Sequence, residues 1–322
     1  MSTVRTETGR APMPQKEDTR RTPGLVPVRE TLRTADRSGA PGEAAPLPPA
    51  RNGWAFWRLL GSELGLTFRR PRNVVMLAIL GVIPIIIGIA LKIASSDEVT
   101  GGLIGAIAGN SLMLTFASFS FLVLLLMPVA VSVVAGDSIA GEAGGGTLRY
   151  LLAAPAGRTR LLAVKYLNAV VYGYAVTVVV AATALVTGLV LFPGGDVTLL
   201  SGTTVSVGDG LLRILIAVGY VGAAMAALAA IALALSTFTE VSIGAIAATL
   251  VLLVVCQVLR AIPQLDAVTP YLLPSWFNRF DAVLRSPIAF GDLTQGLLAF
   301  GAYIALFCSI AWARFSGKDI TS

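Results

Sequence analysis

Six long apolar runs are the feature that most restricts the fold of this 322-residue chain. Each run is close to or above the roughly 20 residues that an α-helix needs to cross about 30 Å of hydrocarbon. Only 13% of the residues are charged, about half the share of roughly 25% in soluble domains. The chain therefore has too few charged residues to form the water-exposed surface of a soluble protein of this size. The sequence therefore predicts an all-α, polytopic membrane protein. Its spans are expected at about 73–94, 111–135, 166–192, 211–236, 241–259 and 294–313.

The residues before the first run divide into two parts. Residues 1–53 are rich in Thr, Arg, Pro, Glu, Gly and Ala without apolar periodicity, which predicts a disordered cytoplasmic tail ahead of a transmembrane domain over residues 54–322. Residues 54–72 mix aromatic and basic side chains, which predicts an N-terminal interfacial helix that ends at Pro71. The alternative is an extension of the first span into the cytoplasm. The expected interfacial anchors are Trp54, Trp57, Arg69 and Arg70.

The placement of positive charge predicts the orientation of the spans. From residue 54 onward, ten of the fifteen Lys and Arg residues fall in segments that are cytoplasmic if the N-terminus is inside. An even number of spans returns the chain to the side on which it started. We therefore expect a multi-pass protein of the plasma membrane with both termini in the cytoplasm. The connection over residues 260–293 is then external, and its prolines and aromatic residues predict short helices that dip into the outer leaflet or cap an exit, with substrate binding as the alternative.

The chain lacks the side chains that most often carry catalysis or bind metals. It has no histidine, and Cys256 and Cys308 both fall inside apolar runs. Residues 141–146 have the glycine spacing of a phosphate-binding loop, but Thr147 stands where the loop requires lysine. Asp137 and Glu142 have no His, Cys or Ser constellation beside them. We expect no enzyme activity, no cofactor or metal in this chain, and no nucleic-acid partner.

One polar stretch, DSIAGEAGGGTLRYLLAAPAGRTRLLAVKY at residues 137–166, separates the second and third runs. The three glycines at 144–146 should end a helix that continues from the second span. Thr147 is a suitable N-cap for a new short helix, which Pro155 ends. Gly157 then permits a turn, and Thr159 is expected to cap the next helix. Arg160 and Lys165 are expected to anchor the third span at the lipid headgroups.

The predicted short helix carries an apolar ridge. Leu148, Leu151 and Leu152 share one face through their spacing, whereas Arg149 points elsewhere. An exposed apolar ridge with a charged rim is typical of a docking surface for another protein. The alternative is a connecting loop whose leucines rest on the bilayer.

The string D-S-I-A-G-E…G-G-T-L-R-Y-L-L-A-A-P…R-T-R-L-L-A-V-K-Y resembles the cytoplasmic signature of the ABC-2 type exporter permeases. The entry segment ending F-R-R-P-R and the ending W-A-R-F-S-G-K-D-I also resemble that family. The resemblance implies that this loop forms a cytoplasmic coupling helix that binds a separate ATPase subunit. The residues that fall in the matching motif are Glu142, Thr147, Leu148, Arg149, Leu151, Leu152 and Pro155.

The resemblance also implies the composition of the complete transporter. Two ABC ATPase subunits would bind ATP and Mg and supply the energy, and a second permease subunit would complete a homodimer or heterodimer in membrane lipid. The alternatives are a secondary transporter driven by an ion gradient and a membrane anchor that transports nothing. Proton coupling is disfavoured because the span interiors carry amides, tyrosines and hydroxyl groups, while the carboxylates sit at span ends. An amphiphilic or lipophilic cargo suits this interior.

Overall fold

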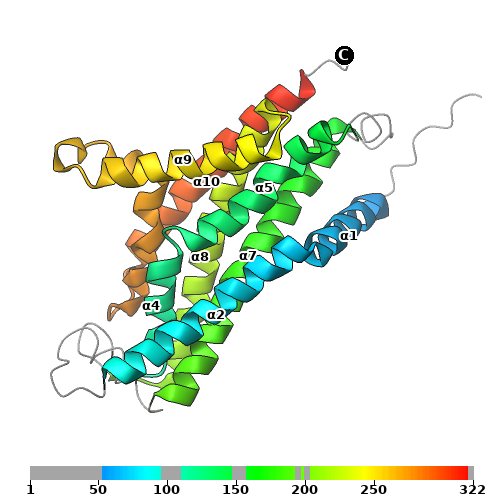
Figure 1. Ribbon diagram of the computed structural model, residues 1–322. Coiled ribbons are helices and arrows are strands. Elements are labelled where there is room, and N and C mark those ends of the chain that lie inside the picture. Colours follow the sequence, from blue (N-terminus) through cyan, green and yellow to red (C-terminus); the bar gives the residue numbers. More distant parts are fainter. Residues whose placement is uncertain (1–52, 96–109, 147–156, 193–196, 199–203, 318–322) are drawn as a thin grey trace, which may run out of the picture. The chain divides into compact units, whose positions relative to one another are not determined.

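The computed structural model describes residues 53–95, 110–146, 157–192, 197–198 and 204–317, and its described part is almost wholly helical (Figure 1). The predicted tail, apart from Gly53, lies outside the described residues. The α-helices are α1 (Gly53–Arg69), α2 (Pro71–Ala94), α4 (Met113–Leu122), α5 (Leu126–Gly144), α7 (Arg158–Leu191), α8 (Val207–Phe238), α9 (Ser242–Arg260) and α10 (Phe290–Ser316). Two short strands, β1 (Val197–Thr198) and β2 (Thr204–Val205), pair antiparallel between α7 and α8.

Six of these helices, α2, α5, α7, α8, α9 and α10, are long and apolar enough to cross a membrane. The chain thus has the character of a multi-pass membrane protein, as the apolar runs predict. α7 has 34 residues and α8 has 32, which corresponds to about 51 Å and 48 Å of helix. Both exceed the roughly 30 Å of a hydrocarbon core. Helix α7 begins at Arg158, eight residues before the predicted start of its span.

The prediction of one continuous helix over the second span, 111–135, is wrong. The chain forms two helices, α4 and α5, with a break at Val123–Leu125, and α5 continues to Gly144. Pro128 in the first turn of α5 has no N–H to bond the carbonyl oxygen of Leu124. The Gln257 side chain of α9 donates to that oxygen instead, at 3.4 Å. A neighbouring helix thus satisfies the carbonyl that proline leaves free.

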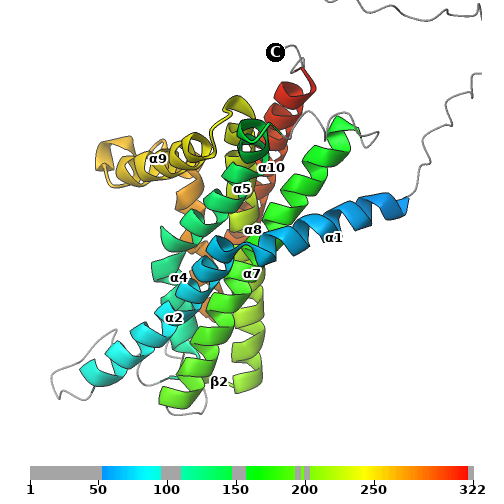
Figure 2. The ribbon, with the colours of Figure 1, turned by 45° about the vertical axis from the view of Figure 1, so that its right-hand side comes forward.

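The core is built around α8, which packs against α5, α7 and α10 (Figures 1 and 2). Small residues on α8 let the neighbours approach closely. A side chain at Gly222 would overlap the Tyr174 ring of α7, whereas Gly219 faces open space. In both views α9 runs across α5 rather than along it. Only three of its residues are buried: Ala245, Thr249 and Leu253.

The connection between α9 and α10 forms three 3₁₀ helices, η1 (Pro263–Leu265), η2 (Thr269–Tyr271) and η3 (Leu273–Leu284), which confirms the prediction of short helices. Helix η3 buries Phe277 and Phe280 and packs against α8 and α10. Arg213 of α8 holds the end of η3, because its guanidinium donates to the backbone oxygens of Val283 and Arg285.

Candidate functional site

The corner between α1 and α2 forms one wall of a polar cluster. Arg70 precedes Pro71 and has extended backbone angles, so the chain turns there and α2 begins with the proline. The Asn73 side chain donates to the Thr67 backbone oxygen at 2.9 Å and satisfies a carbonyl at the end of α1. From α7, the Asn168 side chain donates to the Thr67 hydroxyl at 2.8 Å. The Tyr172 hydroxyl donates to the Asn73 backbone oxygen at 3.1 Å, so α7 fixes the corner at two points.

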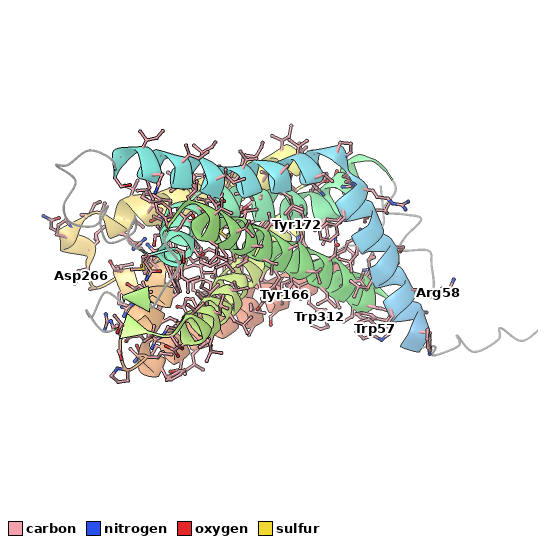
Figure 3. The ribbon with its side chains drawn as sticks, turned by 90° about the horizontal axis from the view of Figure 1, so that it is seen from below. Trp57, Arg58, Tyr166, Tyr172, Asp266 and Trp312 are labelled. Atoms are coloured by element: carbon pink, nitrogen blue, oxygen red, sulfur yellow. The ribbon has the colours of Figure 1, made fainter. Side chains whose placement is uncertain are left out.

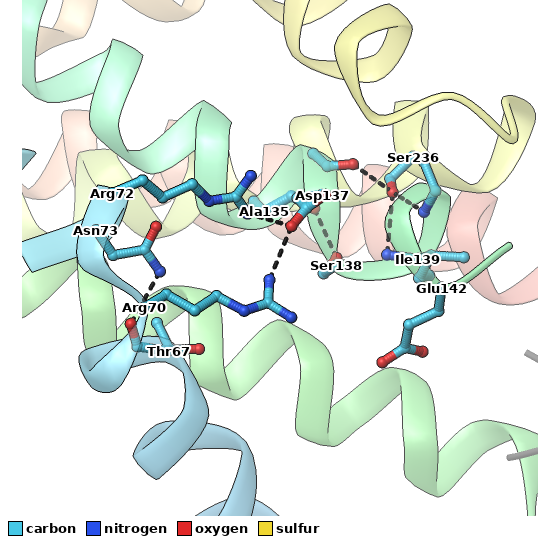
Figure 4. A network of polar contacts seen from close by, with 12 residues as sticks. Thr67, Arg70, Arg72, Asn73, Ala135, Asp137, Ser138, Ile139, Glu142 and Ser236 are labelled. Atoms are coloured by element: carbon cyan, nitrogen blue, oxygen red, sulfur yellow. Dashed lines mark hydrogen bonds and ion pairs between the residues drawn. The ribbon is translucent and has the colours of Figure 1, made fainter. Parts of the chain in front are cut away.

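Asp137 of α5 pairs with the arginines of this corner (Figure 4). Nη1 of Arg70 lies 2.8 Å from Oδ2 of Asp137, and Nη2 of Arg72 contacts the same oxygen. The α5 backbone beside Asp137 is held from α8, where the Ser236 hydroxyl donates to the Gly136 oxygen at 2.7 Å and accepts from the Ala140 N–H at 2.8 Å. The carboxylate therefore stands on a fixed segment and ties the α1–α2 corner to α5.

Lys165 of α7 is the centre of the cluster. Its side chain is buried, with 4% of the residue exposed. Its Nζ lies 2.9 Å from both carboxylate oxygens of Glu63 on α1 and also contacts Glu142 on α5. A buried ammonium requires such partners, because removal of the charge from water costs several kcal/mol. Lys165 thus joins three helices through two carboxylates.

A cavity of about 280 Å³ lies among these groups. Asn73 and Asn168 line it, and the Oδ1 atom of each is buried without a hydrogen-bond partner among the described residues. Two free acceptors in a polar cavity of this size fit ordered water. Within the described residues, no group of three or more His, Cys, Asp or Glu side chains could hold a metal ion. The arrangement can hold helices together through paired charge.

The structure places the predicted site residues in different surroundings. Glu142 lies in the cluster, and Arg70 pairs with Asp137. Trp54 and Trp57 are 81% and 65% exposed, and Trp57 lies on the part of α1 far from the α1–α2 corner (Figure 3). Arg69, the last residue of α1, is also exposed. The predicted coupling helix lies outside the described residues, with Thr147, Leu148, Arg149, Leu151, Leu152 and Pro155.

Both ends of that segment can be compared with the prediction. α5 ends at Gly144 and Gly146 has a φ of 68°, which confirms the break at the glycines. Gly157, with a φ of 71°, is the N-cap of α7. The assignment of Thr159 as that cap is wrong, because Thr159 lies inside α7 and its hydroxyl accepts from the Trp312 indole at 3.1 Å.

Sequence reasoning missed the roles of Lys165 and Glu63. The expected headgroup anchor, Lys165, is instead buried between carboxylates. One signal was available: Glu63 falls between the buried positions Leu60 and Thr67, three and four residues away on the inner face of α1. A carboxylate on an inward face requires a cation. The sequence alone does not say which cation that is.

Comparison with known proteins identifies a family. The family model described as "Protein of unknown function (DUF2705)" matches residues 81–321. No curated protein matches the chain. The matched region contains Asp137, Glu142 and Lys165, while Glu63, Arg70 and Arg72 precede it. Because the match covers about three quarters of the 322 residues, the chain belongs to the DUF2705 family.

Proposed function

We propose that this protein is the permease subunit of an ATP-driven ABC-2 type exporter, with the ATPase in a separate chain. The observation that carries the proposal is the bridge from Lys165 to Glu63 and Glu142. Residues 147–156, which carry the signature Thr147-Leu148-Arg149, are bounded by the ends of α5 and α7 that this bridge joins. A force on this segment would act on α5, α7 and α1 together. In this proposal α1 lies in the membrane interface, and both termini are cytoplasmic.

The six apolar helices supply the substrate pathway that a permease needs. A cavity of about 250 Å³ between α8, α9 and α10 has an almost wholly apolar lining, including Ile231, Leu253 and Phe307. Its polar groups are few, among them the hydroxyls of Thr249 and Tyr303. A lining of this kind favours an amphiphilic or lipophilic cargo. Two ATPase subunits and a second permease subunit complete the proposed transporter.

The decisive variant is Leu148→Asp, which places a charge on the proposed apolar ridge. We expect loss of most of the ATPase that co-purifies with the tagged wild-type chain, because a carboxylate at the centre of an apolar contact is desolvated without a partner. Membrane insertion should be unchanged. The measurement is the molar ratio of ATPase to permease after purification from the native membrane. Leu103→Asp, in the connection predicted to be external, is the matched control and should keep the wild-type ratio. A normal ratio in Leu148→Asp would contradict the proposal.

The orientation of the chain in the membrane can be tested separately. In a Cys256→Ser, Cys308→Ser background, Arg149→Cys should react with a membrane-impermeant maleimide only after the cells are opened. The reason is that the excess of Lys and Arg on this side of the spans favours the cytoplasm. Thr204→Cys, on the exposed strand β2 at the other end of α7 and α8, should react in intact cells. The reverse pattern would place the proposed coupling segment outside and exclude an intracellular ATPase.

A further inference from the structure

A second polar pocket lies where α9 ends and the 3₁₀ helices begin. It has a volume of about 430 Å³, within the range of pockets that bind small molecules. Its lining comes from the last residue of α9 and from the connection that follows, and none of these residues lines the cavity of the charged cluster. Figure 3 shows Asp266, one of its residues, far from Trp57 and Arg58 on α1.

Three residues of this pocket hold a buried polar atom without a hydrogen-bond partner in the described structure. These atoms are Nε of Arg260, Oγ of Ser275 and Oδ1 of Asn278. Buried polar atoms normally have a partner, because an unpaired one loses its bonds to water and gains nothing. Three such atoms from one small pocket indicate an occupant that pairs with them. The set includes two groups that can donate and one that can only accept, so the occupant needs both kinds of atom.

The charges of the pocket balance and are separated from each other. Arg260 and Arg279 are the cations, and Asp266 and Asp281 are the anions. Among the described residues, none of these four forms an ion pair with another within 4.0 Å. Nη1 of Arg260 donates to the neutral Gln257 side chain at 2.7 Å, which leaves its Nε free.

The second arginine is held by an aromatic ring. The Arg279 guanidinium lies 5.4 Å from the centroid of the Trp276 ring, and Nη1 lies 3.8 Å from Asp292, beyond hydrogen-bond distance. The indole of Trp276 is itself fixed, because Nε1 donates to the Pro270 oxygen at 2.9 Å. Arg260 is thus oriented by a neutral amide, and Arg279 by the indole ring and a long ion pair with Asp292. Both keep N–H groups for a ligand.

We propose that this pocket binds a small zwitterion that carries a primary ammonium and an oxyanion, as in phosphoethanolamine. The oxyanion accepts from Arg260, Arg279 and the Ser275 hydroxyl. The ammonium donates to Asp266, Asp281 and Oδ1 of Asn278. The balanced charges of the pocket exclude a ligand with large net charge, and the acceptors select an ammonium that retains its N–H groups. The same chemistry is available in a free metabolite and in a phosphatidylethanolamine headgroup.

The probe is glycerophosphoethanolamine, titrated calorimetrically into the full chain in detergent. We expect saturable binding at least tenfold tighter than that of glycerol 3-phosphate, ethanolamine or glycerophosphocholine, which each lack one feature of the zwitterion. Arg260→Gln removes a cation of the pocket and Asp281→Asn removes an anion. Each variant should weaken binding about tenfold or more. Arg58→Gln is the control, because Arg58 is an exposed arginine of α1 that lies far from Asp266 (Figure 3), and it should change affinity less than twofold.

The two sources are separated in nanodiscs. If the lipid headgroup is the occupant, phosphatidylethanolamine discs should abolish binding of the soluble probe, and phosphatidylcholine discs should retain it. If a free zwitterion is the occupant, binding of the soluble probe should be retained in both phosphatidylethanolamine and phosphatidylcholine discs. Absence of binding in detergent and in phosphatidylcholine discs would overturn the proposal. The proposal would also be overturned if glycerol 3-phosphate, ethanolamine and glycerophosphocholine bound as tightly as glycerophosphoethanolamine. Unchanged affinity in both Arg260→Gln and Asp281→Asn would overturn it as well.

Discussion

Lys165→Met should lower the unfolding free energy by about 3–5 kcal/mol, because it removes the cation of a buried ion pair while the carboxylates stay buried. The substitution preserves most of the apolar side-chain volume but removes the ammonium that lies between the carboxylates of Glu63 and Glu142. One of the two must then take up a proton or move toward water. Equilibrium unfolding in detergent micelles, followed by tryptophan fluorescence, measures the loss.

The control for this variant is Lys92→Met, because Lys92 is an exposed lysine near the end of α2. Its change should stay within about 1 kcal/mol, because the contact that it loses is an exposed cation–π pair with the Phe192 ring, 5.9 Å from Nζ. A triple variant, Lys165→Met with Glu63→Gln and Glu142→Gln, should recover at least half of the loss because the two carboxylates are neutralised together with the lysine. Equal unfolding of Lys165→Met and Lys92→Met would mean that the lysine bridge does not stabilise the fold.

Gly188→Ala should lower the unfolding free energy by about 2–3 kcal/mol through overpacking. A Cβ at this position of α7 would overlap the backbone oxygen of Ser111, just before α4. Backbone cannot rotate away as a flexible side chain can, so α7 and the start of α4 must separate. The same unfolding titration measures the effect.

Gly219→Ala is the matched control for Gly188→Ala. Gly219 lies in α8 with nothing within 4 Å of an added Cβ, and alanine is favoured over glycine in a helix by up to about 1 kcal/mol. This variant should therefore unfold at the wild-type denaturant concentration or above it. If Gly188→Ala behaves like Gly219→Ala, the close approach of α7 to Ser111 is not a determinant of stability.

The apolar runs predict the helices well because length and hydropathy are local properties of the chain. Five of the six predicted spans correspond to single helices with shifted ends. The exception is 111–135, where the helix breaks at Val123–Leu125 and Gln257 of α9 bonds the carbonyl that Pro128 leaves free. No pattern within that span predicts Gln257 as the partner, because the two segments are 133 residues apart.

The sequence singles out two residues of the charged cluster, Glu142 for its place in the signature and Arg70 as an interfacial anchor, but it does not predict their ion pairs. The roles in ATPase coupling and in anchoring stay predictions. The pairing itself joins Lys165 to Glu63 across 102 residues, and Arg70 to Asp137 across 67. Such pairs follow from how helices pack in three dimensions, which hydropathy does not encode. A buried position for Lys165 was unexpected because lysines at span ends usually extend to the headgroups.

The hydrogen bond from the Gln257 side chain to the Leu124 backbone oxygen stabilises the break between α4 and α5 from a neighbouring helix. That neighbour is α9, a helix with most of its surface unburied. Ser242, the first residue of α9, lies beside Asp137 at the charged end of the bundle, so a displacement of α9 would act on α5 at both of its ends.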